Sequence, residues 1–249
     1  MLRSSNGIKG YALEAIDGEI GKTKDFLFDD ECWAVRYLVA DTASWLIGRK
    51  VLISPISLGH ANDRKRSIGI RLSKEQIKDS PSLDSDKPVS RQYEEQFLRF
   101  FGWPVYWQGA YTWGQSSYPG DLYQDPEKAD TDEAVNESEN DKHLRSINEV
   151  RKYHIKATDG EIGHVDDFVI DDDDWIIRYL IVDTHNFLPG RKVIINTEWT
   201  KGINFDDSTI SAELTREEVK NSPEFRPSKP IDRDYEILIH NYYGRRFYW

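Results

Sequence analysis

Most of this chain consists of one unit written twice. Residues 11–107 align with residues 153–249 at a constant offset and without a gap, and about 38 of the 97 aligned pairs are identical. The motif Asp17-Gly18-Glu19-Ile20-Gly21, for example, recurs as Asp159-Gly160-Glu161-Ile162-Gly163. Two copies of one pattern favour one shared fold, so we expect two similar domains of about 100 residues each.

The composition argues against several classes of function. The formal net charge of −11 disfavours a general binder of nucleic acid or of anionic membranes, because both need a dense basic surface. Cys32 is the only cysteine, so an intrachain disulfide and a cysteine-based zinc cage are excluded. The sequence has no signal peptide and no apolar run of about 20 residues. We therefore expect a soluble, cytoplasmic protein without a transmembrane segment.

The first part of each copy predicts a small β-barrel. Asp17-Gly18 lies between two strand-like runs and predicts a tight hairpin with positive φ at both central residues. Gly21 and Gly163, which recur three residues after the turn, indicate a bulge or a bend. Five or six short strands fit into about 65 residues, and closing such a sheet removes its exposed edges.

One strand in each copy is apolar on both faces, at residues 33–40 and 175–182, and we expect it to be covered on both sides. An arginine interrupts each of these strands. Because a buried arginine needs an acceptor, two structural ion pairs are predicted. The predicted pairs are Arg36 with Asp41 and Arg178 with Asp183.

Two short helices are predicted after the strands of each copy. Capping boxes begin at Ser73 and Thr215, and a proline halts each helix about two turns later. A second helix with an apolar face follows, and it ends at a glycine suited to a C-cap, Gly102 or Gly244.

Aromatic residues are dense after the second helix of each copy. They either pack on their own or the sister barrel, or they form an interface for a protein partner, since Tyr and Trp supply large contact areas with a polar group. Stacking on nucleic acid is disfavoured, because the first copy has no basic residue between Trp103 and Tyr118. The candidate interaction surface consists of Trp103, Tyr106, Trp107, Tyr111, Trp113, Tyr248 and Trp249.

An acidic segment separates the copies. Residues 121–141 hold nine acidic residues against one lysine, which is typical of a mobile linker, with an acidic binding tail as the alternative. The expected domains are residues 1–107, a flexible linker at 108–148, and residues 149–249.

No catalytic, cofactor-binding or metal-binding set of residues can be assigned, and we expect a protein that is not an enzyme and needs no cofactor. None of the six histidines has a histidine at its partner position, so a histidine-based site in both copies is excluded, and one in a single copy has no motif behind it. The acidic run at residues 171–174 is contiguous and lacks the glycine of a calcium loop, so a solvated hairpin tip is the better interpretation. Phosphate-binding loops, nucleophile elbows and Cys/His pairs are absent from the sequence.

These residues resemble the PRC-barrel domain. The resemblance rests on residues 17–21, on Asp25-Phe26 and on residues 36–39, and it covers roughly residues 7–72 and 149–214. It implies two tandem small PRC-type β-barrels, each followed by two short helices, in a mainly β protein with α-helical appendages.

The family implies binding rather than catalysis. Its members include the cytoplasmic domain of the photosynthetic reaction-centre H subunit and a domain of a bacterial ribosome-maturation factor. We expect a non-enzymatic interaction or scaffold protein that binds a protein partner or a second copy of itself. The alternatives are an accessory factor of photosynthetic or quinone-linked electron transfer, and an accessory factor of ribosome or RNA processing.

Overall fold

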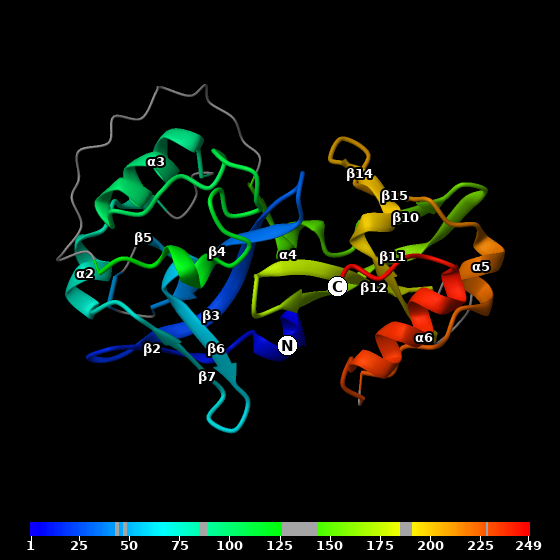
Figure 1. Cartoon of the computed structure of the whole chain (residues 1–249), viewed down its shortest axis with the longest axis horizontal. Coiled ribbons are helices and arrows are strands. Elements are labelled where there is room, and N and C mark those ends of the chain that lie inside the picture. Colours follow the sequence, from blue (N-terminus) through cyan, green and yellow to red (C-terminus); the bar gives the residue numbers. More distant parts are fainter. Residues whose placement is uncertain (43–44, 47–48, 85–88, 126–143, 185–190, 228) are drawn as a thin grey trace. The chain divides into compact units, whose positions relative to one another are not determined.

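The computed structural model describes the chain except for residues 43–44, 47–48, 85–88, 126–143, 185–190 and 228. The described residues are mainly β with a few short helices (Figure 1). They form two compact units. The first-copy unit contains Ile8–Ser146 and Asp172–Trp175; the second-copy unit contains Met1–Gly7, Ile147–Asp171 and Ile176–Trp249.

The first-copy unit is built on a mixed sheet. Its hydrogen-bonded order is β5-β4-β3-β2-β7-β6, with β8 added to β5, and only the β2–β7 pair is parallel. Among the described residues no pairing joins β5 to β6, so the sheet is open. The strands are β2 (Ala12–Ala15), β3 (Gly18–Asp29), β4 (Ala34–Asp41), β5 (Arg49–Ile53), β6 (Leu58–Asn62), β7 (Ser67–Ile70) and β8 (Leu83–Asp84).

The second-copy unit repeats this order as β13-β12-β11-β10-β15-β14, again with one parallel pair, β10–β15, and again open among the residues described. The expectation of a mainly β fold is confirmed, but a closed barrel is not seen in the strand pairing. The strands are β10 (His154–Ala157), β11 (Gly160–Asp171), β12 (Ile176–Asp183), β13 (Lys192–Asn196), β14 (Thr200–Asn204) and β15 (Thr209–Ala212).

Each copy contributes a short arm to the unit of the other copy. β1 (Leu2–Ser4), at the start of the first copy, pairs with β11 in the second-copy unit. β9 (Leu144–Ser146), which has the same sequence Leu-Arg-Ser, pairs with β3 in the first-copy unit. One-turn helices follow the two arms, α1 (Ser5–Ile8) and α4 (Ile147–Val150). The duplication therefore extends to these arms, and the chain exchanges them.

The predicted hairpin and bulge are present, but the turn residues differ from the expectation. Ala15 pairs with Gly18, so Ile16 and Asp17 form the connection, and positive φ falls on Gly18 and not on Asp17. The bulge lies beside Gly21, whose φ is +141°.

The first helix after the strands of each copy is capped by side chains from the capping box and from the Asp-Gly motif. α2 (Lys74–Asp79) and α5 (Arg216–Asn221) both have the predicted capping box. Asp17 Oδ1 accepts a hydrogen bond from the Lys74 amide at 2.8 Å, and Asp159 Oδ1 accepts one from the Arg216 amide at the same distance. The Asp of the Asp-Gly motif thus caps a helix 57 residues later in the chain.

The second helix of each copy, α3 (Arg91–Phe100) or α6 (Arg233–Tyr243), belongs to the fold. In α3, the Phe97 ring contacts the Tyr37 ring of β4, with ring centroids 5.4 Å apart. The strand β4 is buried along nearly its whole length. This confirms a strand covered on both faces. Gly102 and Gly244 have the left-handed conformation expected of C-caps. Figure 1 shows α5 and α6 next to each other, and Tyr242 Oη donates to the Glu218 carbonyl across them at 2.7 Å.

The expected linker is described only in part, because residues 126–143 lie outside the described residues. Residues 108–125, which the sequence analysis placed in the linker, include two buried side chains. One is Trp113, and the other is Leu122, the last residue of the 3-10 helix η2 (Pro119–Leu122). The domain boundaries at residues 107 and 149 stay a prediction. No helix among the described residues has the length and apolar character needed to cross a membrane.

Candidate functional site

Arg36 is the centre of a buried cluster in the first-copy unit. It occupies a bulge of β4, because Val35 and Tyr37 both have pairing partners in β3 and Arg36 has none in the register. Its Nη2 lies 3.1 Å from Asp29 Oδ2, and its Nη1 donates to the Thr112 carbonyl at 2.7 Å. The guanidinium therefore has strong acceptors inside the protein.

The predicted pair of Arg36 with Asp41 is wrong. Asp41 lies five residues further along β4, roughly 16 Å away at 3.3 Å per residue, which is beyond the reach of an arginine side chain. Asp29 ends β3 and lies opposite the start of β4, so the hairpin brings it close. In the second copy, Arg178 Nε likewise lies 4.0 Å from Asp171 Oδ2. In both copies the nearby carboxylate is the aspartate seven positions before the arginine: Asp29 hydrogen-bonds Arg36, and Asp171 lies at ion-pair distance from Arg178.

Aromatic rings and a buried glutamate complete the cluster. The guanidinium carbon of Arg36 lies 3.7 Å from the centroid of the Tyr106 ring and 4.8 Å from that of Trp113. Tyr106 Oη donates to Glu94 Oε1 of α3 at 2.6 Å, and Arg91 Nη1 lies 3.5 Å from Glu94 Oε2. Glu94 is fully buried. Burial, and next to it the Glu94 carboxylate, raises the pKa of Tyr106 well above its usual value, so this phenol donates and does not ionise.

The second-copy unit holds the same cluster at the equivalent positions. The phenol of Tyr248 donates to Glu236 Oε1 at 2.6 Å, and the phenol of Tyr179 donates to the same oxygen at 2.9 Å. Arg233 Nη1 lies 3.1 Å from Glu236 Oε2, and Arg178 stacks on Tyr248 at 4.2 Å. The arginine–glutamate–tyrosine arrangement of Arg91, Glu94 and Tyr106 therefore recurs as Arg233, Glu236 and Tyr248.

One helix position beside the cluster carries a different residue in each copy. His240 stands where the first copy has Leu98, and it is fully buried. Its Nδ1 lies 2.6 Å from the Arg246 carbonyl, which makes Nδ1 the donor, and its Nε2 lies 3.1 Å from Tyr179 Oη. Both ring nitrogens therefore have protein partners, and the arrangement joins α6 to the C-terminal residues and to β12.

The candidate aromatic surface divides into buried and exposed members. Tyr111 is 58% exposed and Trp249 is 48% exposed, so both rings are accessible to solvent. The half-buried members are Trp107 and Tyr248, and the buried members are Trp103, Tyr106 and Trp113. Trp113 Nε1 donates to the Asp174 carbonyl at 2.9 Å, so the buried rings hold the first-copy unit together.

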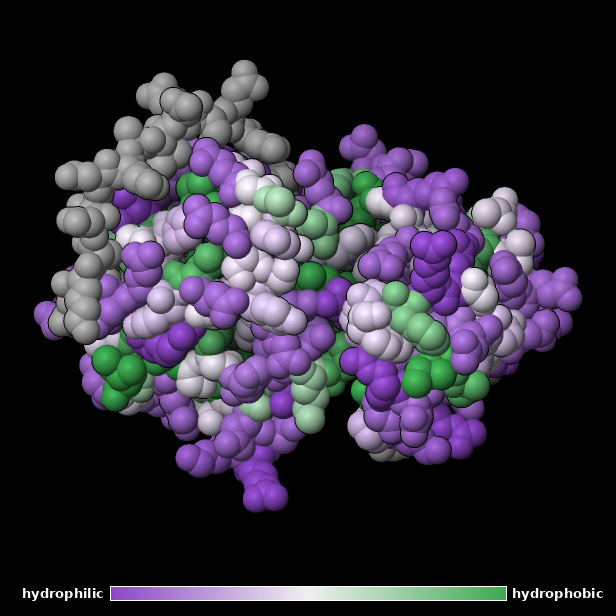
Figure 2. All heavy atoms as spheres, viewed as in Figure 1, coloured by the Kyte–Doolittle hydropathy of each residue, from purple (hydrophilic) through white to green (hydrophobic). Residues whose placement is uncertain are grey.

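Exposed apolar residues do not merge on the face seen in Figure 2. Strongly hydrophobic residues form small groups there, separated by hydrophilic ones.

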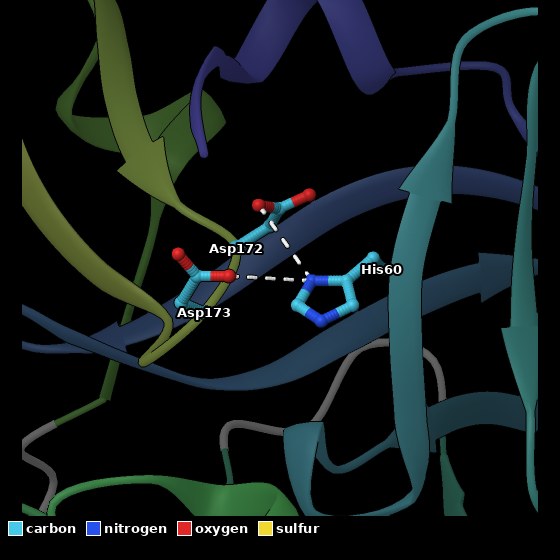
Figure 3. Close-up of side chains that lie close together, drawn as sticks. All are labelled: His60, Asp172 and Asp173. Carbon is cyan, nitrogen blue, oxygen red and sulfur yellow. Dashed lines mark ion pairs between the residues drawn. The ribbon is translucent and has the colours of Figure 1, made fainter.

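Sequence reasoning missed one cluster of metal-ligating side chains. His60 of β6 lies beside Asp172 and Asp173 of the β11–β12 hairpin tip, and one ligand atom from each lies within 4.8 Å of the others (Figure 3). The acidic run was interpreted as a solvated tip, but Asp172 is buried. His60 and Asp172 are 112 positions apart, so no local motif in the sequence reveals that they are neighbours.

The comparisons with known proteins add no family to this description. A scan against models of protein families finds no match to the chain, and a search of curated proteins also finds no match.

Proposed function

We propose that this protein is a non-enzymatic binding or scaffold protein built from two PRC-type barrels with helical appendages. The observation that carries the proposal is what the two copies share. Their common polar groups, such as Arg36 with Asp29 and Tyr106 with Glu94, bind one another inside a unit. Exposed aromatic side chains such as Tyr111 and Trp249 then remain as contacts for a partner.

The order of the strands supports a barrel in each unit. β5 and β6 stand at opposite ends of a six-strand order, and a flat sheet would separate them by about 24 Å. The 3-10 helix η1 (Pro55–Ser57) is nearly the whole connection, so Ile53 and Leu58 are five residue steps apart and at most about 18 Å distant. The sheet must therefore curl. The second copy has the same short connection through η4 (Thr197–Trp199).

The proposed partner is another protein or a second copy of this chain. The net charge of −11 disfavours nucleic acid, and the aromatic residues with polar surroundings suit a protein surface. The roles in electron transfer and in ribosome or RNA processing rest on the resemblance to the PRC-barrel family alone.

Affinity capture with matched variants tests the proposal. The wild-type chain, expressed at native level, is expected to retain a stable partner or to form a homo-oligomer seen by light scattering. Tyr111→Ser and Trp249→Ser should each be tested, and at least one should weaken that association tenfold or more. Ile16→Ser is the control, because Ile16 is 73% exposed and lies at a hairpin turn outside the aromatic set.

Two results would overturn the proposal. One is a monomeric wild-type chain without any partner. The other is an association that both aromatic variants and the control leave equally intact, because the exposed rings would then contribute nothing.

A further inference from the structure

We infer that His60, Asp172 and Asp173 form a binding site for one divalent transition-metal ion in the first-copy unit. His60 is on β6, and the two aspartates lie in Asp172–Trp175, the tip between β11 and β12. These four residues belong to the first-copy unit, as His60 does. Figure 3 shows the imidazole Nδ1 directed toward both carboxylates. The site would supply one nitrogen and two oxygen ligands.

The His60–Asp173 distance suits two ligands of one ion. Two ligands about 2.1 Å from a metal are about 3.0 Å apart at a right angle and about 3.4 Å apart at the tetrahedral angle. His60 Nδ1 lies 3.4 Å from Asp173 Oδ1 and 4.0 Å from Asp172 Oδ1. A small rotation of the exposed imidazole closes the longer distance, since its side chain is 72% exposed.

The electrostatics also favour a cation. The Asp172 side chain is only 2% exposed, and a buried carboxylate is stabilised by a positive charge beside it. Two carboxylates and one divalent ion form a neutral set. The acidic run at residues 171–174 further raises the local concentration of cations at this tip.

The donor set selects the kind of ion. An imidazole with two carboxylates suits zinc, manganese, nickel or cobalt, whereas calcium needs six or more oxygen ligands. With three protein ligands, water would complete the coordination. The ion would fasten the hairpin tip to β6, where the Ala61 amide already donates to Asp172 Oδ2 at 3.4 Å. This inference is independent of the proposed binding function.

The duplication provides a matched control for the experiment. Glu31 is the counterpart of Asp173, but the counterpart of His60 is Gly202, so the equivalent site lacks its nitrogen ligand. His60 and Asp173 have exposed side chains, 72% and 53%, so His60→Ala and Asp173→Asn should leave the fold intact. Far-UV circular dichroism checks this for every variant.

Calorimetric titration of the chelator-treated chain with zinc chloride tests the site. The wild type and Glu31→Gln are expected to bind one zinc ion per chain with the same affinity, and zinc should raise their melting temperature. His60→Ala and Asp173→Asn should each bind at least about tenfold more weakly. A wild type that binds no zinc, or binding that survives unchanged in both ligand variants, would overturn the inference.

Discussion

Replacing Gly163 with alanine tests the packing of β11 against β12. Gly163 has φ of +145°, and an added Cβ would lie 2.1 Å from the Asp183 carbonyl oxygen and 2.9 Å from its carbon. Nonbonded carbon and oxygen atoms need about 3.2 Å, so β12 would have to move by roughly 1 Å. The substitution therefore strains the backbone and separates two paired strands.

The magnitude follows from these two effects. Holding a non-glycine residue at such a φ costs about 1–3 kcal/mol, and losing one or two strand hydrogen bonds costs about 1 kcal/mol each. We expect Gly163→Ala to lower the free energy of unfolding by about 3 kcal/mol. With a urea dependence of about 1.5 kcal/mol per molar, the unfolding midpoint of the second-copy unit falls by about 2 M.

Urea unfolding followed by circular dichroism and fluorescence measures this change. Gly21→Ala should weaken the first-copy unit equally, because its Cβ would also lie 2.1 Å from a carbonyl oxygen, that of Asp41. Gly69→Ala is the control, since no atom lies within 4 Å of the added carbon. A loss below about 1 kcal/mol in both Gly21→Ala and Gly163→Ala would refute the reasoning.

Two further predictions concern the buried cluster of the first-copy unit. Glu94→Leu should lower the free energy of unfolding by about 3–5 kcal/mol, because it removes a buried charge from its partners Arg91 and Tyr106. Glu94→Gln should lower it by less. Equal stability of Glu94→Leu and the wild type in urea would contradict this prediction. Burial of the Cys32 sulfur, which lies 3.1 Å from Arg36 Nη2, raises the thiol pKa from 9.0 to about 11 despite the exposure of the residue as a whole. The protonated thiol is favoured by folding, and this stabilisation is lost as the pH rises from about 9 toward 11. Alkylation of the folded chain at pH 8 should therefore be on the order of 100-fold slower than in urea, and equal rates would contradict the raised pKa.

Local patterns in the sequence determined most of the elements. The hairpin after Ala15, the capping boxes at Ser73 and Thr215 and the doubly buried β4 each depend on residues close in the chain. Such features are set by backbone conformation and by side chains within one or two turns, and a single sequence records them directly.

The tertiary structure alone decided which distant residues meet. Asp29 rather than Asp41 binds Arg36, because a hairpin folds one strand end back onto another. The rings of Trp103 and Trp113 are buried because the appendage packs within its unit, and no periodicity separates these rings from the exposed Tyr111.

The exchange of segments between the copies was also invisible to the sequence. Each arm, β1 or β9, has the same three residues, so either pairing satisfies the local pattern equally well. The same holds for the hairpin tip with Asp172 and Asp173, which the fold brings to His60 from 112 positions away. Two segments with the same sequence can pair with the same strands, and only the tertiary fold determines which pairing forms.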